Sequence, residues 1–195
     1  MLMGKLFAMI GLPKSGKSTY SKSFLAKYTA NSFSTGDLND DWDFQIVVPR
    51  AIVRADDIRL ALTGQRFNSH IEDYVHSIYY TTIKAQLLAG NDILADDTHS
   101  TWDSIRKLLS CDSKCEFWWS FPKEKIYNIN KLKYYKPWAE HITICKKRAK
   151  DSGQEDLFPI IDRMAGQLER LAYEWDGRIE EEREKARNKK YNITQ

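Results

Sequence analysis

The sequence predicts an α/β fold in which helices flank a mainly parallel sheet of four or five strands. Short apolar runs alternate with amphipathic helical stretches along the chain, which is the pattern of strands joined by crossover helices. The first apolar run leads directly into a loop of the form G-x-x-x-x-G-K-[ST] at residues 11–18. The 195 residues, 42% of them hydrophobic, suit one domain with its own core, so we expect a single domain over residues 1–195.

Composition indicates the cellular setting. Three cysteines, an odd number, argue against a disulfide framework and favour a reducing compartment, so we expect a cytoplasmic protein. No apolar run approaches the length of a membrane span, so we expect no membrane partner. Residues 1–5 lead straight into the first predicted strand, and we expect no signal peptide.

Positive charge is concentrated in one segment. Residues 121–150 contain nine lysines and arginines against two glutamates, a net charge of +7. Because the whole chain carries +3, the remainder carries about −4. A segment with this charge favours an anionic partner.

The first strand and the loop after it form the predicted nucleotide site. Residues 5–10 are an apolar run long enough for one buried strand, and the loop follows at once. The next apolar residues have the spacing of one helical face: Ser21, Phe24, Leu25 and Tyr28. A strand, a glycine-rich loop and a helix in this order are typical of a phosphate-binding loop, whereas a chance match would lack the flanking elements.

The residue types in the loop suit a nucleoside triphosphate. Gly11 and Gly16 let backbone N–H groups converge on phosphate oxygens, and the helix that starts near Gly16 adds its positive end. Lys17 is expected to reach the β- and γ-phosphates, and Ser18 to offer its hydroxyl to Mg²⁺. We predict that ATP or GTP is bound with Mg²⁺ by Gly11, Lys14, Ser15, Gly16, Lys17, Ser18 and Thr19.

The next stretch holds a first pair of carboxylates. Residues 31–50 are acidic and favour a solvated loop over a metal site, with a short strand at 45–48 as one interpretation. An apolar triplet at residues 51–53 then leads into Asp56 and Asp57. Either carboxylate could cap the helix that follows. Alternatively, one stands at the carboxyl end of a parallel strand and accepts the proton of an attacking hydroxyl.

A long helix and a second strand that ends in acids come next. Seven residues share one predicted helical face before a stop at Gly90: Ile71, Tyr74, Val75, Ile78, Thr82, Ala85 and Leu88. Residues 91–98 then predict a short strand that ends in Asp96 and Asp97. One of these carboxylates is expected to reach Mg²⁺ or to orient Lys17, and the alternative is that they cap the next helix.

An aromatic run precedes the basic segment. Residues 115–121 are β-prone and follow a helix that carries Ile105, Leu108 and Leu109. Residues 122–137 interleave lysines with tyrosines. Lysines can bind phosphates and aromatic rings can stack on bases, so this composition suits a single-stranded nucleic-acid acceptor. The alternative is a lysine-rich surface insertion, which would have the same composition.

Two helices separated by a short polar loop complete the chain. The first starts at Trp138, and its end carries the basic residues of 146–150. Pro159 opens the second, whose apolar face is Ile161, Met164, Leu168, Leu171, Trp175 and Ile179. This arrangement is typical of a lid that brings an arginine over the phosphates, and we expect such a lid at about residues 145–165. The alternative is that the basic residues only complement the negative end of the helix dipole. Residues 180–190 are almost all charged, and we expect a solvated helical tail over about residues 180–195.

A zinc site is an alternative use of four of these residues. Cys111 and Cys115, with His141 and Cys145, supply four candidate zinc ligands in two pairs. Cys115 begins a predicted strand and Cys145 falls on an apolar helical face, where a cysteine behaves as a small hydrophobe. The sequence therefore favours buried thiols over zinc.

These motifs together resemble the P-loop kinases of the polynucleotide kinase family, best known from phage end-healing enzymes. The matching pieces are the loop at 11–19, the Asp-Asp-x-Arg motif within 54–59, Asp97-Thr98, and a lid with residues 145–149 and 161–164. They span about residues 5–169. The loop alone is shared by many families, but its combination with Asp-Asp-x-Arg at this distance is more specific.

The resemblance implies a role for each matching residue. Asp56 would be the general base that takes the proton of a 5′-hydroxyl, and Arg59 would contact the phosphate on the 3′ side of the accepting nucleotide. Lys17 and Arg148 would stabilise charge on the transferred phosphoryl group. The implied ligands are Asp56, Arg59 and Thr98 for the acceptor and Ser18 and Asp97 for Mg²⁺.

The chain also departs from the family pattern. His99 replaces the asparagine of the third motif, Ser152 stands where a second lid arginine is common, and Ala55 precedes the proposed base. The resemblance implies transfer of the γ-phosphoryl group of ATP to a hydroxyl, most readily that of a polynucleotide, at its 5′-hydroxyl or at a modified base. Two alternatives stay open: a small-molecule or nucleoside kinase, and a nucleotide-dependent binding module or switch in which Asp56 only caps its helix.

Overall fold

The computed structural model describes residues 4–21, 24, 50–65, 70–121, 125–126 and 138–192. Two sequence predictions lie outside these residues. One is the acidic stretch with its strand at 45–48, and the other is most of the lysine- and tyrosine-rich segment 122–137. Every residue of the predicted phosphate loop and lid is described.

Five strands form one sheet in the order β2-β3-β1-β4-β5. The central strand β1 (Leu6–Ile10) pairs in parallel with β3 (Asp92–Asp96) and with β4 (Glu116–Ser120). Strand β2 (Arg50–Arg54) adds to β3 in parallel, and the two-residue β5 (Lys125–Ile126) pairs antiparallel with β4. The predicted mainly parallel sheet is confirmed.

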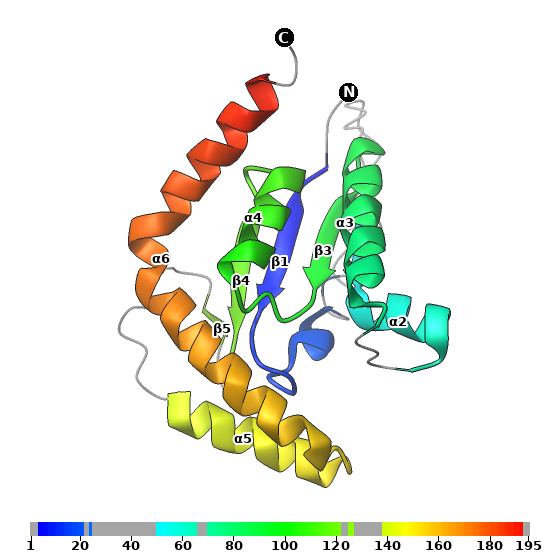
Figure 1. The fold of residues 1–195 in the computed structure, drawn as a ribbon, viewed down its shortest axis with the longest axis vertical. Coiled ribbons are helices and arrows are strands. Elements are labelled where there is room, and N and C mark those ends of the chain that lie inside the picture. Colours follow the sequence, from blue (N-terminus) through cyan, green and yellow to red (C-terminus); the bar gives the residue numbers. More distant parts are fainter. Residues whose placement is uncertain are drawn as a thin grey trace, which may run out of the picture.

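The helices that flank the sheet follow the predicted order. Their bounds are α2 (Ala55–Thr63), α3 (Glu72–Leu88), α4 (Trp102–Cys111), α5 (Trp138–Asp151), the 3₁₀ turn η2 (Glu155–Leu157) and α6 (Phe158–Asn192). In Figure 1, α4 crosses the face of the sheet between α3 and α6, and α5 with the start of α6 forms a hairpin at the arrowhead end of the strands.

Alternating residues of β1 face two different clusters, as the pleat of a strand requires. Met9 packs with Phe24, from the helix after the loop, and with Leu94 of β3. Ala8 and Ile10 belong instead to the large core formed with α3, α4 and α6. The helix after the loop therefore packs on one face of the sheet, and α3, α4 and α6 pack on the other.

The buried face of α3 differs from the predicted one. Its fully buried residues follow an i, i+4 row: Val75, Tyr79, Ile83 and Leu87. Tyr74 and Leu88, which the sequence placed on the apolar face, are 60% and 64% exposed. The i, i+4 row places Tyr79, Ile83 and Leu87 in the core, so packing of these larger side chains sets the rotation of the helix.

The charged tail is helical and mostly exposed, but one residue of its first turn is buried. Helix α6 continues without a break to Asn192, and Glu182 on it is buried. Glu182 accepts hydrogen bonds from Arg106 Nε and Nη2 on α4, at 2.9 and 3.2 Å. Trp175 anchors the middle of the helix, stacked on Trp102 at 5.6 Å between ring centroids. Residues around 182 therefore dock α6 on α4.

Neither pair of aspartates caps a helix in the predicted way. The N-cap residue of α2 is Arg54, which makes no side-chain cap, so Asp56 and Asp57 lie inside the first turn. The N-cap of α4 is Thr101, whose hydroxyl accepts from the Ser104 N–H. Both acidic pairs are thereby left for other contacts at the carboxyl edge.

Candidate active site

The glycine-rich loop follows β1 at the carboxyl edge of the sheet. Gly11 touches the end of β4, since a Cβ there would lie 2.6 Å from the Ser120 carbonyl oxygen. Gly16 has a φ of +107°, in the region that only glycine adopts easily, and Lys14 has a φ of 64°. Regular helix begins at residue 17. The turn between β1 and this helix thus depends on backbone conformations that glycine adopts most easily.

Lys17 is buried at the base of this loop. Its ammonium donates to the carbonyl oxygens of Gly11 and Leu12, at 2.9 and 2.8 Å. Burial lowers the pKa of Lys17, and the negative charges of Asp96 and Asp97 oppose that shift. The Lys17 side chain is therefore held against the loop by two backbone carbonyl groups.

The C-terminal end of α5 contacts the same loop. Arg148 Nη1 donates to the Lys14 carbonyl oxygen at 3.0 Å, and Lys14 Nζ donates to Ser152 Oγ at 2.9 Å. The Arg148 guanidinium also lies 4.0 Å from the position that a Cβ on Gly16 would take. The predicted lid arginine and the predicted loop are therefore in contact, and Ser152 fills the position of the absent second arginine.

A second group of charges lies at the start of α2. Arg59 donates from Nε and Nη2 to the two carboxylate oxygens of Glu72 on α3, at 2.8 and 2.7 Å. Its Nη1 donates to Asp56 Oδ1 at 2.7 Å. Burial alone would lower the pKa of Arg59, but the Glu72 hydrogen bond and the nearby carboxylates outweigh it and raise the pKa. Asp56 itself is largely exposed, with its side chain 67% accessible.

The two aspartates after β3 have different environments. Asp96 Oδ2 is buried and accepts from Ser21 Oγ at 2.7 Å and from Arg54 Nε at 3.0 Å. Asp97 is only half-buried, and its Oδ1 accepts from the Thr98 N–H at 2.7 Å. The structure therefore makes Asp96 a bridge between β2, β3 and the helix after the loop, and leaves Asp97 the more accessible carboxylate.

His99 fixes the loop after β3. It has a φ of 44°, and its buried ring lies 3.1 Å from the Tyr79 hydroxyl, measured from Nε2. Burial lowers the pKa of His99 to about 4. On the other side of this turn, the Thr98 carbonyl oxygen accepts from the Gly11 N–H at 3.2 Å. A continuous set of contacts thus joins α3 to the phosphate loop.

The four zinc candidates do not assemble into a metal site. Among the described residues, no group of three or more histidine, cysteine or acidic side chains could hold a metal ion. Burial raises the pKa of the Cys145 thiol to about 11 and that of Cys115 further, so both thiols stay protonated. These cysteines act as small core residues.

The structure brings together most residues that the sequence singled out. The negative charges of Asp96, Asp97 and Asp56 are among those that oppose the lowering of the Lys17 pKa. The sequence analysis missed Glu72, because an acidic residue in the first turn of a helix is commonly explained by its favourable interaction with the helix dipole. It also missed the Ser21 contact with Asp96, for which the sequence carries no signal.

Comparisons with known proteins rest on structure alone. No protein-family model and no curated protein matches this sequence. One chain of the Pnkp1/Rnl/Hen1 RNA repair complex resembles it with a TM-score of 0.60 and 19% identity, over 90% of this chain. The match covers 47% of that chain, so this protein spans about half its length.

Two further structures resemble it more distantly. A second structure of the Pnkp1/Rnl/Hen1 complex matches with a TM-score of 0.44 and 20% identity, over 62% of this chain and 36% of that one. A gluconokinase from Sinorhizobium meliloti 1021 matches with a TM-score of 0.40 and 13% identity, over 88% and 95%.

The sheet, the glycine-rich loop after β1 and the flanking helices confirm the predicted α/β fold with a mainly parallel sheet, and the match with a TM-score of 0.60 is a likeness of fold. No helix in the described part of the chain combines the length and hydropathy that crossing a membrane requires.

Proposed function

We propose that this protein transfers the γ-phosphoryl group of ATP to a hydroxyl, and that the acceptor is the 5′-hydroxyl end of a polynucleotide. The observation that carries the proposal is the convergence of two charge groups at one edge of the sheet. Lys17 and Arg148 meet at the phosphate loop. The Asp56–Arg59 pair stands beyond the end of β2, within electrostatic reach of Lys17.

In the reaction, a hydroxyl oxygen of the acceptor forms a bond to the γ-phosphorus while the bond from phosphorus to the leaving ADP oxygen breaks. The hydroxyl proton passes to the Asp56 carboxylate, which is exposed and therefore accessible to it. Lys17 and Arg148 neutralise charge on the phosphoryl oxygens, and the loop N–H groups hold the donor. Positioning and charge neutralisation account for most of such catalysis.

The available oxygens fit a magnesium ion. The Ser18 hydroxyl is exposed and makes no hydrogen bond with the described residues, and Asp97 keeps one carboxylate oxygen without a hydrogen bond there. Mg²⁺ prefers oxygen ligands such as hydroxyl and carboxylate groups. It usually binds only one or two of them from the protein and keeps several of its water ligands. Ser18 and Asp97 would hold the ion, which would neutralise charge on the donor phosphates.

Three observations support a polynucleotide over a small acceptor. Arg59 presents a guanidinium, already positioned by Glu72, beside the proposed base, and guanidinium groups suit phosphate recognition. The fold likeness with a TM-score of 0.60 is to a chain of an RNA repair complex. The interleaved lysines and tyrosines of residues 122–137 add the composition of a single-strand groove.

The test is transfer of label from γ-labelled ATP with Mg²⁺. We expect label on a 5′-hydroxyl single-stranded oligonucleotide, loss of that label with Lys17→Ala, and a loss of at least about a hundredfold with Asp56→Asn. Both variants should stay folded by circular dichroism. Label only on a nucleoside or sugar would replace the polynucleotide with a small acceptor. Release of free phosphate alone, unchanged by Asp56→Asn, would instead identify a nucleotide-hydrolysing switch.

A further inference from the structure

A cavity of about 190 Å³ opens between α3 and α4, beside the loop after β3. Asp97 and Thr98 line it, and both belong to the proposed acceptor and metal site. The remaining wall comes from α3, through His76 and Tyr80, and from the first turns of α4, through Ser104 and others. A group bound in the cavity would therefore lie next to the reacting end of the acceptor.

The size and the rings of the cavity favour one flat group. Pockets that take drug-sized ligands measure about 300–1,000 Å³, so this smaller space suits a single ring system and not a whole nucleotide. The His76 and Tyr80 rings are stacked, with 6.4 Å between centroids and 25° between planes. Aromatic faces of this kind are the surfaces on which proteins stack unpaired bases.

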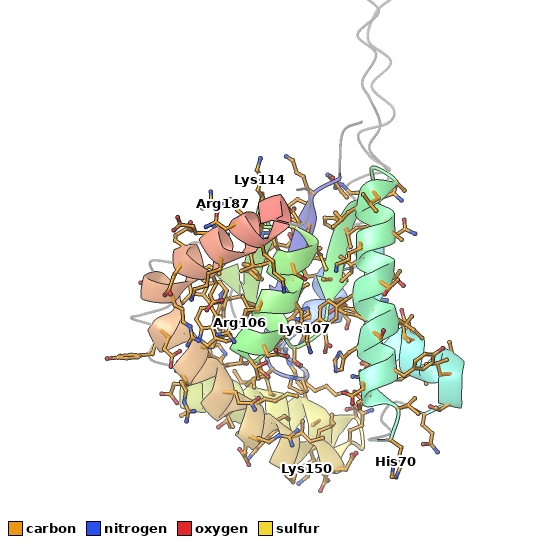
Figure 2. The ribbon with its side chains drawn as sticks, turned by 45° about the horizontal axis from the view of Figure 1, so that its top comes forward. His70, Arg106, Lys107, Lys114, Lys150 and Arg187 are labelled. Carbon is orange, nitrogen blue, oxygen red and sulfur yellow. The ribbon has the colours of Figure 1, made fainter. Side chains whose placement is uncertain are left out.

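The charge of the cavity disfavours a phosphate. Two carboxylates, Asp97 and Asp103, face one ammonium, Lys107. Lys107 Nζ is already paired with Asp103 Oδ2 at 2.8 Å. Figure 2 shows Lys107 on the side of α4 toward α3, whereas Arg106 lies on the side toward α6, where it pairs with Glu182. The cavity therefore lacks an uncompensated cation for an anionic group.

Hydroxyl groups supply the remaining polar contacts. The Thr98 hydroxyl makes no hydrogen bond with the described residues. The Ser104 hydroxyl donates to the Thr101 carbonyl oxygen at 2.7 Å and keeps lone pairs that can accept. The two hydroxyl groups offer a donor and acceptors to the edge of a heterocycle.

We infer that this cavity receives the uncharged base of the acceptor's 5′-terminal nucleotide, stacked against His76 and Tyr80 and hydrogen-bonded by Thr98 and Ser104. The inference rests on the proposed function and extends it from the reacting hydroxyl to the group that selects the acceptor.

The experiment compares two 5′-hydroxyl oligonucleotides that differ only in whether the first nucleotide carries its base or is abasic. With the wild-type protein, we expect kcat/KM for the intact oligonucleotide to exceed that for the abasic one by about tenfold, the value expected for one stacked base. Ser104→Leu fills the cavity from α4 and should bring this ratio close to one by raising KM for the intact acceptor. The KM for ATP should not change.

Ser110→Leu is the matched control. Ser110 lies on the same helix and also donates its hydroxyl to a backbone carbonyl at 2.7 Å, but it does not line the cavity. It should keep the tenfold preference. Equal rates for intact and abasic acceptors with the wild-type protein would overturn the inference and leave the proposed function standing, and that comparison needs no variant. No transfer to either oligonucleotide would remove the proposed function, and the inference with it.

Discussion

Replacing Glu72 with glutamine should weaken both the fold and the transfer step. Glu72 accepts two hydrogen bonds from Arg59, and the two side chains are 19% and 11% exposed. The change removes the negative charge and leaves one carbonyl acceptor, so one charge-assisted hydrogen bond is lost. Such a bond contributes about 1.5–3 kcal/mol, and partial exposure reduces this to about 1–2 kcal/mol of unfolding free energy.

The same change should lower the rate through Asp56. Arg59 Nη1 already donates to Asp56 Oδ1 at 2.7 Å. Without the charge of Glu72, Arg59 is neutralised by Asp56 alone, which makes that carboxylate a weaker proton acceptor and leaves the guanidinium less firmly placed for a phosphate. We expect kcat to fall about tenfold and the KM for the acceptor to rise, while the KM for ATP stays unchanged.

Urea unfolding and steady-state kinetics measure the two effects. Asp73→Asn is the control, because Asp73 lies in the same first turn of α3 but is exposed and has no bond to Arg59. The Asp73→Asn variant loses only the interaction with the helix dipole, which contributes about 0.3–1 kcal/mol to the unfolding free energy, and it should keep the wild-type kcat. If Glu72→Gln retained wild-type kcat while its stability fell, Glu72 would be structural only, and the reasoning that links it to Asp56 would be refuted.

Three other changes have defined outcomes. Gly11→Ala should abolish ATP binding in a titration, because its Cβ would lie 2.6 Å from the Ser120 carbonyl oxygen and would displace the loop; ATP binding at wild-type strength would contradict this. Arg148→Ala should lower kcat by about 10³-fold with little change in stability, since the side chain is exposed; a change in KM alone would argue for a binding role. The hydrogen bond from Arg106 lowers the pKa of Glu182 below its ordinary 4.5, so the stability it adds is present above that pH and is lost as pH falls. Glu182→Gln should therefore flatten the loss of unfolding free energy as pH falls below 4.5, and an unchanged acid profile would argue against it.

The strands and the loop could be predicted from the sequence because each depends on residues that are close together in the chain. The apolar run at residues 6–10 and the glycines at 11 and 16 determine a strand and its turn within a few positions. Apolar spacing also placed the core faces of α4 and α6, where buried residues recur at the helical period. The face of α3 was misjudged by part of a turn, because Tyr79 and Leu87 are buried by contacts that spacing does not reveal.

The contacts of Asp96 could not be predicted, since they join residues that are far apart in the chain. Asp96 binds Arg54 from a neighbouring strand and Ser21 from the helix after the loop. Before the strand order is known, Asp96 and Asp97 are equivalent neighbours in the sequence. The alternation of a strand then separates them: Asp96 ends β3 inside the sheet, and Asp97 begins the loop that faces the cavity.

Helix α3 unites the acceptor side of the site. Glu72, His76, Tyr79 and Tyr80 are spaced by four, three and one residues, so they share one stretch of a helical face. The first holds Arg59, the second and fourth line the cavity, and the third holds His99. The donor side uses other elements, namely the loop after β1 and the end of α5. Substitutions on this face of α3 should therefore change which acceptor is used, while substitutions in the loop should change the use of ATP.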